Sequence, residues 1–222
     1  MKALAFSGGK DSMACLHFLQ DLDCAIHVDT GFSYPETRRL VEYASSILPM
    51  HIVRSNRHEQ NEREGLPADV VPIDWTNLGQ QITGPKATKI QSYLGCCYEN
   101  ISLPILVKAK ELGVTELVYG QRNQEHYKSP SRNGSIIEGI TRLHPIEDWT
   151  DAEVMAYLET KMDVPDHYSI KHSSLDCYDC TAFRKESDDR VEWMRERYPE
   201  FHAVYAKRIG ELNAALAEAY YG

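Results

Sequence analysis

A pair of glycines between an apolar run and an amphipathic segment constrains this chain more than any other feature. The apolar run covers residues 2–6, and residues 11–22 carry apolar side chains at helical spacing. The sequence that joins them is Ser7-Gly8-Gly9-Lys10-Asp11-Ser12. Glycines let backbone N–H groups approach phosphate oxygens, and the amino end of a helix favours negative charge. The segment therefore predicts a strand, a phosphate-binding turn and a helix.

The turn is not a Walker motif, because the Gly-x4-Gly-Lys-Ser/Thr spacing is absent. Lys10 adds a cation to it, and the hydroxyl groups of Ser7 and Ser12 add donors. A plain strand-to-helix turn with no ligand is the alternative interpretation.

Strand and helix patterns alternate through most of the chain. Further strands are predicted over residues 24–28, 51–54 and 116–119, and helices over residues 35–48, 96–112 and 150–160. Pro35 suits a first helical turn, and Thr150 with Glu153 forms a capping-box pattern. This order predicts an α/β fold with a doubly wound, mainly parallel sheet and ligands at the carboxyl ends of its strands.

The predicted domain organisation has two parts. Residues 1–165 form the nucleotide-binding α/β domain, in which residues 55–93 are expected to be a mobile or substrate-covering loop. Residues 166–222 form a helical C-terminal extension with a cysteine-bearing loop and helices over residues 187–197 and 200–220. The last helix is amphipathic and is expected to pack on the core, with a second subunit as the alternative.

Charge and hydropathy exclude several function classes. The net charge of −9 opposes sequence-independent wrapping of nucleic acid, so charge does not indicate a nucleic-acid acceptor, although such an acceptor stays possible. No stretch has the roughly 18 consecutive apolar residues of a membrane span, and the apolar run at residues 3–6 is too short for a secretory signal. We therefore expect a cytoplasmic protein with no membrane partner.

Two charged residues follow predicted strands at the edge where the glycine turn lies. Asp29 ends the second strand, where a carboxylate holds a ribose hydroxyl or Mg²⁺; a turn or cap carboxylate is the alternative. Arg122 follows the fourth strand, and its planar guanidinium suits phosphate; a surface salt bridge is the alternative. Weaker candidates for a second anion site are Lys86, Lys89, Lys128 and Arg132.

Six cysteines in a chain expected to be cytoplasmic favour metal or redox chemistry over disulfides. The pair Cys96-Cys97 and the Cys177-x-x-Cys180 motif supply four thiolates, which is the number that a structural zinc or an iron-sulfur cluster takes. Spacing alone leaves zinc, a cluster and incidental thiols open. Cys15 and Cys24 lie on apolar faces and are predicted to be core residues.

Together these motifs resemble the phosphoadenylylsulfate (PAPS) reductase family of PP-loop ATP pyrophosphatases. The resemblance extends from the glycine turn through Asp29-Thr30-Gly31, Pro35-Glu36-Thr37, Gly120-Gln121-Arg122 and residues 144–150, His-Pro-Ile-Glu-Asp-Trp-Thr. It implies an adenine nucleotide alpha hydrolase-like fold that grips the β,γ-pyrophosphate of ATP, with Mg²⁺. The nucleotide-binding residues that it implies are Ser7, Gly8, Gly9, Lys10, Asp11, Ser12, Asp29, Thr30, Gly31, Gly120 and Arg122.

The resemblance also bears on the cysteines. Adjacent cysteines followed by Cys-x-x-Cys-Thr are similar to the 4Fe-4S ligands of adenylylsulfate reductases, which implies a cluster at Cys96, Cys97, Cys177 and Cys180, with zinc as the alternative. Family reductases carry a further cysteine near the carboxyl terminus, whereas none follows Cys180 here. They also commonly depart from the Lys-Asp-Ser form of the turn, which this chain keeps.

The sequence thus favours an ATP pyrophosphatase or adenylyltransferase in sulfur metabolism or sulfur transfer, with Lys10, Asp11 and Arg122 as catalytic residues. A sulfur-donor or electron-donor protein is an expected partner. The first alternative is an adenylylsulfate or phosphoadenylylsulfate reductase that forms sulfite from a sulfonucleotide. The second is a non-catalytic subunit that binds nucleotide and cluster for a partner.

Overall fold

The computed structural model describes residues 1–85, 89–125, 129, 131–170, 175–184 and 188–221. These residues form two compact units. The first comprises Met1–Asp29, Ser33–Arg54 and Leu103–Ser169, and the second comprises Thr30–Phe32, Ser55–Ser102 and Ile170–Gly222. The sequence did not indicate that residues 55–102 group with the C-terminal segment, and the boundary at residue 165 stays a prediction.

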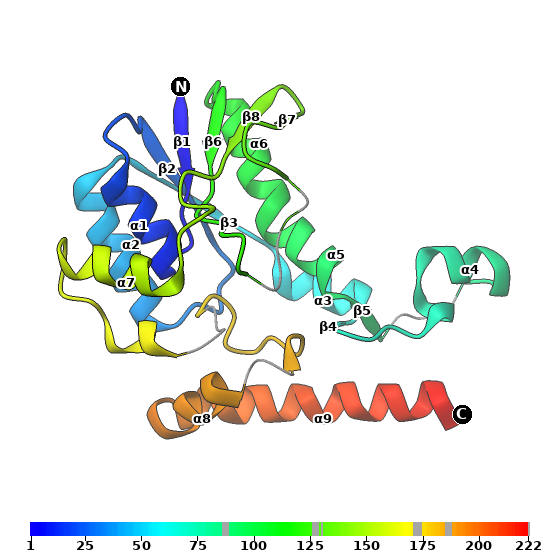
Figure 1. Cartoon of the computed structure of the whole chain (residues 1–222). Coiled ribbons are helices and arrows are strands. Elements are labelled where there is room, and N and C mark those ends of the chain that lie inside the picture. Colours follow the sequence, from blue (N-terminus) through cyan, green and yellow to red (C-terminus); the bar gives the residue numbers. More distant parts are fainter. Residues whose placement is uncertain (86–88, 126–128, 130, 171–174, 185–187, 222) are drawn as a thin grey trace. The chain divides into compact units, whose positions relative to one another are not determined.

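A six-stranded sheet organises the described part of the first unit, in the order β3-β2-β1-β6-β8-β7 (Figure 1). All its pairings are parallel except that of β7 with β8, which confirms the predicted mainly parallel sheet. Its strands are β1 (Lys2–Ala5), β2 (Cys24–Asp29), β3 (Met50–Arg54), β6 (Glu116–Val118), β7 (Ile136–Ile137) and β8 (Ile140–Leu143). The last two were missed, because such short strands leave almost no periodic pattern.

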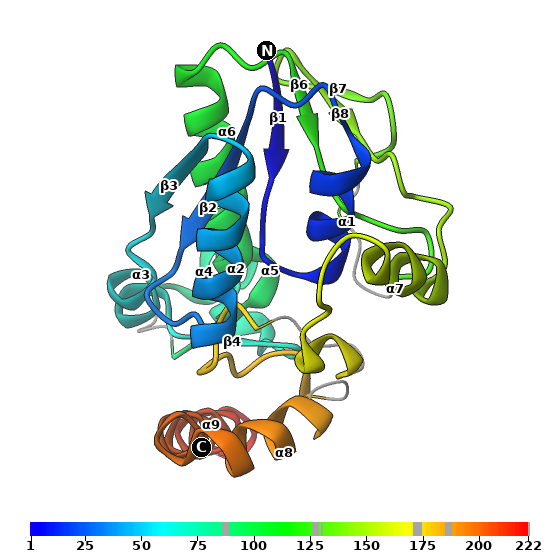
Figure 2. The ribbon, with the colours of Figure 1, turned by 90° about the vertical axis from the view of Figure 1, so that its left-hand side faces the viewer.

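Helices cover both faces of this sheet (Figures 1 and 2). One face is covered by α1 (Lys10–Phe18), α2 (Pro35–Ile47) and α7 (Asp151–Glu159), and the other by α6 (Leu103–Glu111). The main apolar core includes Leu4 of the sheet with Met13, Val41 and Val154 of the three helices. Coverage of both faces confirms the doubly wound architecture.

The helix ends follow local chemistry. Pro35 occupies the first turn of α2, and Thr150 caps α7 with a full capping box to Glu153, as predicted. The first helix is shorter than predicted: α1 ends at Phe18 because Leu19 is extended, and its N–H bonds to the Cys15 carbonyl. Leu22 still packs on the core, which explains why its spacing resembled a longer helix.

The second unit contains a two-stranded parallel sheet and several helices. Its elements are α3 (Arg57–Glu64), β4 (Leu66–Ala68), a 3-10 turn (Ile73–Trp75), α4 (Asn77–Thr83), β5 (Ile90–Ser92), α5 (Tyr93–Cys97), a π-helical turn (Tyr98–Ser102), α8 (Asp188–Arg197) and α9 (Pro199–Tyr221). The two C-terminal helices match the prediction closely, although the predicted start at residue 187 lies outside the described residues. No helix in the described ranges is both long and apolar enough to span a membrane.

The expectation of a loop over residues 55–93 was wrong. Helix α3 buries the polar side chains of Gln60 and Asn61, and the amides of Gln60 and Gln91 bond to each other at 2.7 and 2.9 Å. Buried polar groups are stable when they are hydrogen-bonded to one another. A helix of this kind shows no apolar stripe, so hydropathy patterning does not detect it.

Candidate functional site

The glycine turn of the first unit follows β1 and is held by its own side chains. Gly8 has φ +81°, a conformation that favours glycine, and a Cβ there would lie 3.2 Å from Thr37 Cγ2. Ser12 Oγ donates to the Gly9 carbonyl at 2.9 Å and accepts from the Ser7 N–H at 3.3 Å. These internal contacts therefore fix the backbone conformation of the turn without a ligand.

Gly120 brings a second turn against the first. A Cβ at Gly120 would lie 2.5 Å from the carbonyl carbon of Asp11, so only glycine lets the end of β6 approach the start of α1 this closely. Strands β1 and β6 are neighbours at the centre of the sheet; β2 and β3, which follow β1, lie on one side, and β7 and β8, which follow β6, lie on the other. This reversal of strand order is where ligands bind in open α/β sheets.

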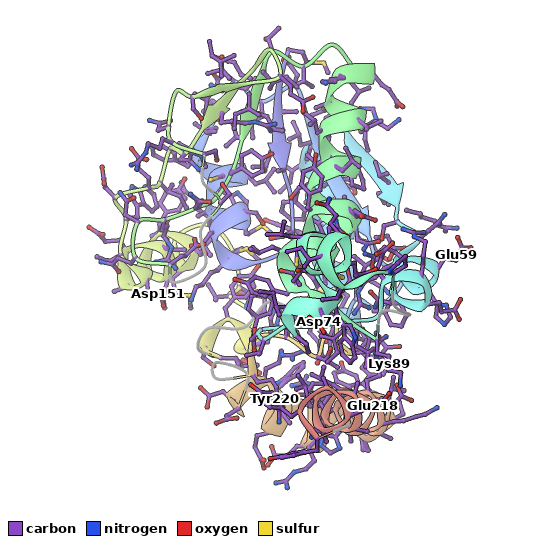
Figure 3. The ribbon with its side chains drawn as sticks, turned by 90° about the vertical axis from the view of Figure 1, so that its right-hand side faces the viewer. Glu59, Asp74, Lys89, Asp151, Glu218 and Tyr220 are labelled. Carbon is purple, nitrogen blue, oxygen red and sulfur yellow. The ribbon has the colours of Figure 1, made fainter. Side chains whose placement is uncertain are left out.

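The three residues predicted to be catalytic come together at this point. Arg122 Nε donates to Asp11 Oδ1 at 2.6 Å, and Lys10 Nζ lies 2.6 Å from Asp151 Oδ1. A second bond from Arg122, through Nη2 to Asp151 Oδ1 at 2.9 Å, closes the network. Two cations and two carboxylates thus lie beside the glycine turn, and the side chain of Asp151, labelled in Figure 3, is 58% exposed.

The two carboxylates differ in their electrostatic environment. Burial raises the pKa of Asp11 and outweighs the opposing effect of Arg122. Partial burial also disfavours ionisation of Asp151, but the Lys10 hydrogen bond and charge hold its pKa below the ordinary value. Asp151 is therefore the exposed, ionised partner that both cations share.

Two residues of this site were missed by the sequence analysis. Asp151 directly follows the Trp149-Thr150 pair of the family-like motif, and that position was the available signal. Tyr168 donates from its buried hydroxyl to the Gly8 carbonyl at 2.9 Å. No local pattern marks Tyr168, because its partner lies 160 positions away.

The predicted Asp29-Thr30-Gly31 segment crosses the boundary between the two units. Asp29 ends β2 in the first unit, as expected for a residue at the carboxyl edge of the sheet. Thr30 belongs to the second unit, where its Oγ1 lies 3.4 Å from Cys177 Sγ. Nucleotide binding by Asp29, Thr30 and Gly31 stays a prediction.

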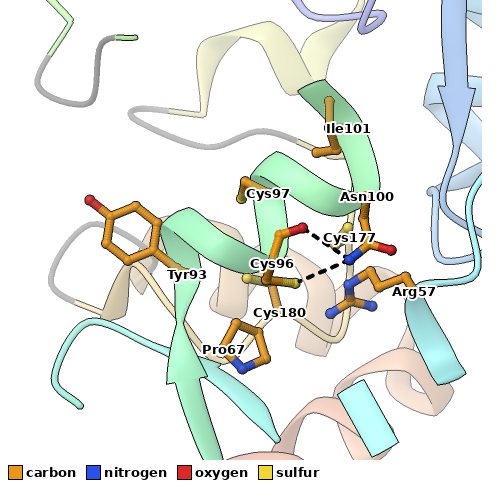
Figure 4. A pocket seen from close by; sticks show the side chains of 9 residues that line it. All are labelled: Arg57, Pro67, Tyr93, Cys96, Cys97, Asn100, Ile101, Cys177 and Cys180. Carbon is orange, nitrogen blue, oxygen red and sulfur yellow. Dashed lines mark hydrogen bonds between the residues drawn. The ribbon is translucent and has the colours of Figure 1, made fainter. Parts of the chain in front are cut away.

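The four predicted metal ligands line one cavity in the second unit (Figure 4). Cys96 and Cys97 come from the end of α5, whereas Cys177 and Cys180 come from a segment about eighty residues later. The amide of Asn100 donates to the Cys96 carbonyl at 3.0 Å and lies 3.8 Å from its Sγ. The cavity is completed by Arg57, Pro67, Tyr93, Asn100 and Ile101.

Burial disfavours the thiolate form of three of these cysteines. Burial raises the pKa of Cys96 and Cys97, and it raises that of Cys177 to about 12. Thiolates are the form that binds metal, so binding here releases protons. Within the described ranges no three Cys, His, Asp or Glu side chains are yet grouped as a metal ion requires. The cysteines therefore face one cavity without converging on one point.

The remaining cysteines and cations have other surroundings. Cys15 and Cys24 are 0% and 3% exposed, which confirms them as core residues.

Lys89, proposed for a second anion site, instead pairs with Glu218 through a 2.6 Å contact between Nζ and Oε2, and both are labelled in Figure 3. Lys86 and Lys128, from the same set, lie outside the described residues.

Comparison with known proteins identifies the class. A family model described as "Phosphoadenosine phosphosulfate reductase domain" matches residues 2–183, a range that contains both sets of residues described above. The chain therefore belongs to the phosphoadenosine phosphosulfate reductase family. A search of curated proteins found no match.

Two solved structures are similar to the chain at low sequence identity. A phosphoadenylyl-sulfate reductase from Candida auris, in a phosphate complex, is 18% identical with a TM-score of 0.48, over 75% of each chain. An FMN adenylyltransferase from Candida glabrata, in complex with ATP, is 15% identical with a TM-score of 0.35. That match covers 71% of this chain and 45% of the other, so this chain spans less than half the length of that protein.

Proposed function

We propose that this chain is an ATP pyrophosphatase or adenylyltransferase of its family and acts in sulfur metabolism or sulfur transfer. ATP is its nucleotide, with Mg²⁺, and a 4Fe-4S cluster bound by Cys96, Cys97, Cys177 and Cys180 is its second cofactor. A protein that donates sulfur or electrons is the expected partner.

One observation carries the nucleotide part of this proposal: the glycine turn and Gly120 meet at the reversal of strand order. The tight approach of Gly120 to Asp11 places Arg122 beside the amino end of α1. Backbone N–H groups at a helix start, a lysine and an arginine are all groups that bind phosphate. Because Asp11 and Asp151 pair with the two cations here, a pyrophosphate group binds by replacing a carboxylate as their partner.

Asp151 supports the same interpretation because it is an exchangeable partner. Its side chain is 58% exposed, and it holds both Lys10 and Arg122. A bound pyrophosphate group competes with this carboxylate for the two cations. Asp11, which is less exposed, keeps Arg122 oriented while the exchange occurs.

The proposed reaction is attack of an acceptor oxygen on the α-phosphorus of ATP. The bond between the α-phosphorus and its bridging oxygen breaks, the acceptor becomes adenylylated, and pyrophosphate leaves. Lys10, Arg122 and the N–H groups of the turn stabilise the charge that develops on the leaving group. Mg²⁺ bound to the phosphates supplies further charge neutralisation, and carboxylates such as Asp29 have the oxygen ligands that it prefers.

The cofactor proposal rests on the chemistry of the cysteine-lined cavity. Four thiols and no carboxylate or histidine line it among the described residues, and this donor set suits a 4Fe-4S cluster or zinc. The family resemblance favours the cluster. When bound, it supplies electron transfer or a fixed negative charge. Iron and acid-labile sulfide content, measured on anaerobically purified protein, separates a cluster from zinc.

A sulfonucleotide reductase is the second candidate, favoured by the family to which the chain belongs. The two candidates differ in the ligand that the turn binds, since a sulfonucleotide has no β,γ-pyrophosphate. Equilibrium affinities of anaerobic protein for ATP with Mg²⁺, adenylylsulfate and its 3′-phosphate distinguish them. Preference for ATP supports the proposal, and preference for either sulfonucleotide overturns it. ATP binding without turnover, with acceptor and partner present, supports a non-catalytic subunit instead.

A further inference from the structure

A buried arginine faces the cysteine-lined cavity of the second unit. Arg57, at the start of α3, is 2% exposed and is one of the residues that line the cavity (Figure 4). Its Nη1 donates to Asp179 Oδ1 at 2.6 Å, and its guanidinium lies 4.9 Å from the centroid of the Phe32 ring. Neither the glycine turn nor the four proposed ligands explain why a charge is buried here.

The buried ion group has more positive than negative charge. Asp179 is 0% exposed and also accepts a hydrogen bond from Arg208 of α9. Two guanidinium groups therefore share one carboxylate. Because Arg208 offsets the charge of Asp179, the charge of Arg57 is left uncompensated toward the cavity. Burying an uncompensated charge is costly, so a negative group is expected opposite it.

The hydrogen bonding of Arg57 also indicates a negatively charged group in the cavity. Its Nη2 is buried and has no hydrogen-bond acceptor among the residues that the structure describes. An arginine guanidinium stays charged in proteins, and the adjacent Asp179 carboxylate favours that form. A charged donor with a spare N–H thus adjoins the sulfur atoms of the cavity.

We propose that Arg57 is a positioning residue that neutralises negative charge on the cofactor bound by the four cysteines and so raises its reduction potential. This inference rests on the cluster in the proposed function. A cluster with four thiolate ligands is anionic and gains a further negative charge on reduction. A nearby cation and hydrogen bonds to sulfur stabilise the reduced form more than the oxidised form.

The test is a redox titration of anaerobic protein, followed by electron paramagnetic resonance. Arg57→Gln removes the charge and is expected to lower the midpoint potential, whereas Arg57→Lys restores most of it. Asp179→Asn removes the one negative charge of this ion group and is expected to raise the potential. Arg208→Gln removes the second cation of the same ion group, but Arg208 does not line the cavity; this variant is expected to lower the potential by less than Arg57→Gln does.

The opposite signs at Arg57 and Asp179 separate an electrostatic role from a structural one. If the role of Arg57 is purely structural, both variants lose stability and their midpoint potentials do not shift in opposite directions. That result overturns the inference. If Arg57→Gln does not fold, a potential in Asp179→Asn at or below that of the wild type overturns it equally. ATP affinity, measured in parallel, reports whether each variant retains a folded nucleotide site.

Failure of the cofactor proposal gives a different result. Wild-type protein that contains zinc, or no metal, after anaerobic purification and reconstitution with iron and sulfide overturns both proposals. Wild-type protein with a cluster whose potential does not respond to Arg57→Gln overturns the role of Arg57 alone.

Discussion

The glycine turn and the cysteine-lined cavity are built in opposite ways. The turn is contiguous in sequence, from Ser7 to Ser12, and its cations pair with the exposed Asp151. The cavity draws its four cysteines from two segments about eighty residues apart and places a buried ion group beside them. Cations paired with an exposed carboxylate suit a site whose substrate exchanges, whereas a buried ion group suits a resident cofactor.

This contrast predicts that cofactor and nucleotide binding separate by mutation, with the largest effect at the cysteines. Cys180→Ser removes one ligand, so we expect cofactor affinity to fall by more than the roughly 10–100-fold typical of outer-shell changes. Iron content and visible absorption measure this loss, and ATP affinity should change less than about twofold. Cys24→Ala, in the apolar core, is the control and should keep the cofactor. Joint loss of cofactor and ATP binding in Cys180→Ser would contradict the separation.

The second prediction concerns the cation of the glycine turn. Lys10→Ala should weaken ATP binding by about 1.5–3 kcal/mol, or roughly 10–100-fold in Kd, because a charge-assisted hydrogen bond to phosphate is lost. Isothermal titration measures the change, and cofactor content should not alter. Lys89→Ala, which removes the exposed partner of Glu218, should leave ATP affinity unchanged. An equal loss in both variants would mean that Lys10 acts through overall charge.

Whether a region could be predicted from the sequence depends on how far apart its interacting residues lie along the chain. The glycine turn, the capping box at Thr150 and the paired cysteines are local patterns, and each was found. Tyr168 was missed because its partner lies far away in the sequence, and Asp151 was missed although it directly follows Trp149-Thr150 of the family-like motif. Helix α3 was missed because it buries polar side chains, Arg57 among them, which read as a solvated loop.

The third prediction tests the close approach of Gly120 to Asp11 at the proposed nucleotide site. Gly120→Ala should destabilise the protein by about 1–3 kcal/mol, because the added Cβ overlaps backbone that has no room to move. It should also weaken ATP binding by displacing the start of α1. Gly210→Ala in α9 is the matched change, since an added Cβ meets nothing there. It should stabilise the protein by about 0.4–1 kcal/mol and leave ATP affinity unchanged. Chemical denaturation measures the change in the free energy of unfolding for both variants.

The smallest expected effect is a pH dependence of stability that arises in the first unit. His144 is 2% exposed, and burial, aided by Arg142, lowers its pKa below 6.5 despite the opposing charge of Glu147. As pH falls below 6.5, the unfolded chain binds a proton before the folded chain does. Stability should therefore fall by at most about 1.4 kcal/mol per pH unit, until the folded pKa is reached. Denaturation curves recorded at several pH values should show a weaker dependence of stability on pH for His144→Gln. An unchanged dependence would mean that another group causes it.

The central claim is that the glycine turn holds the β,γ-pyrophosphate of ATP. The most direct measurement is competition of inorganic pyrophosphate and AMP against labelled ATP with Mg²⁺, on the wild type and Lys10→Ala. The account predicts that pyrophosphate displaces ATP from the wild type, that AMP competes poorly, and that Lys10→Ala loses most of its affinity for pyrophosphate. AMP that competes as well as ATP, with no effect of pyrophosphate, would contradict it.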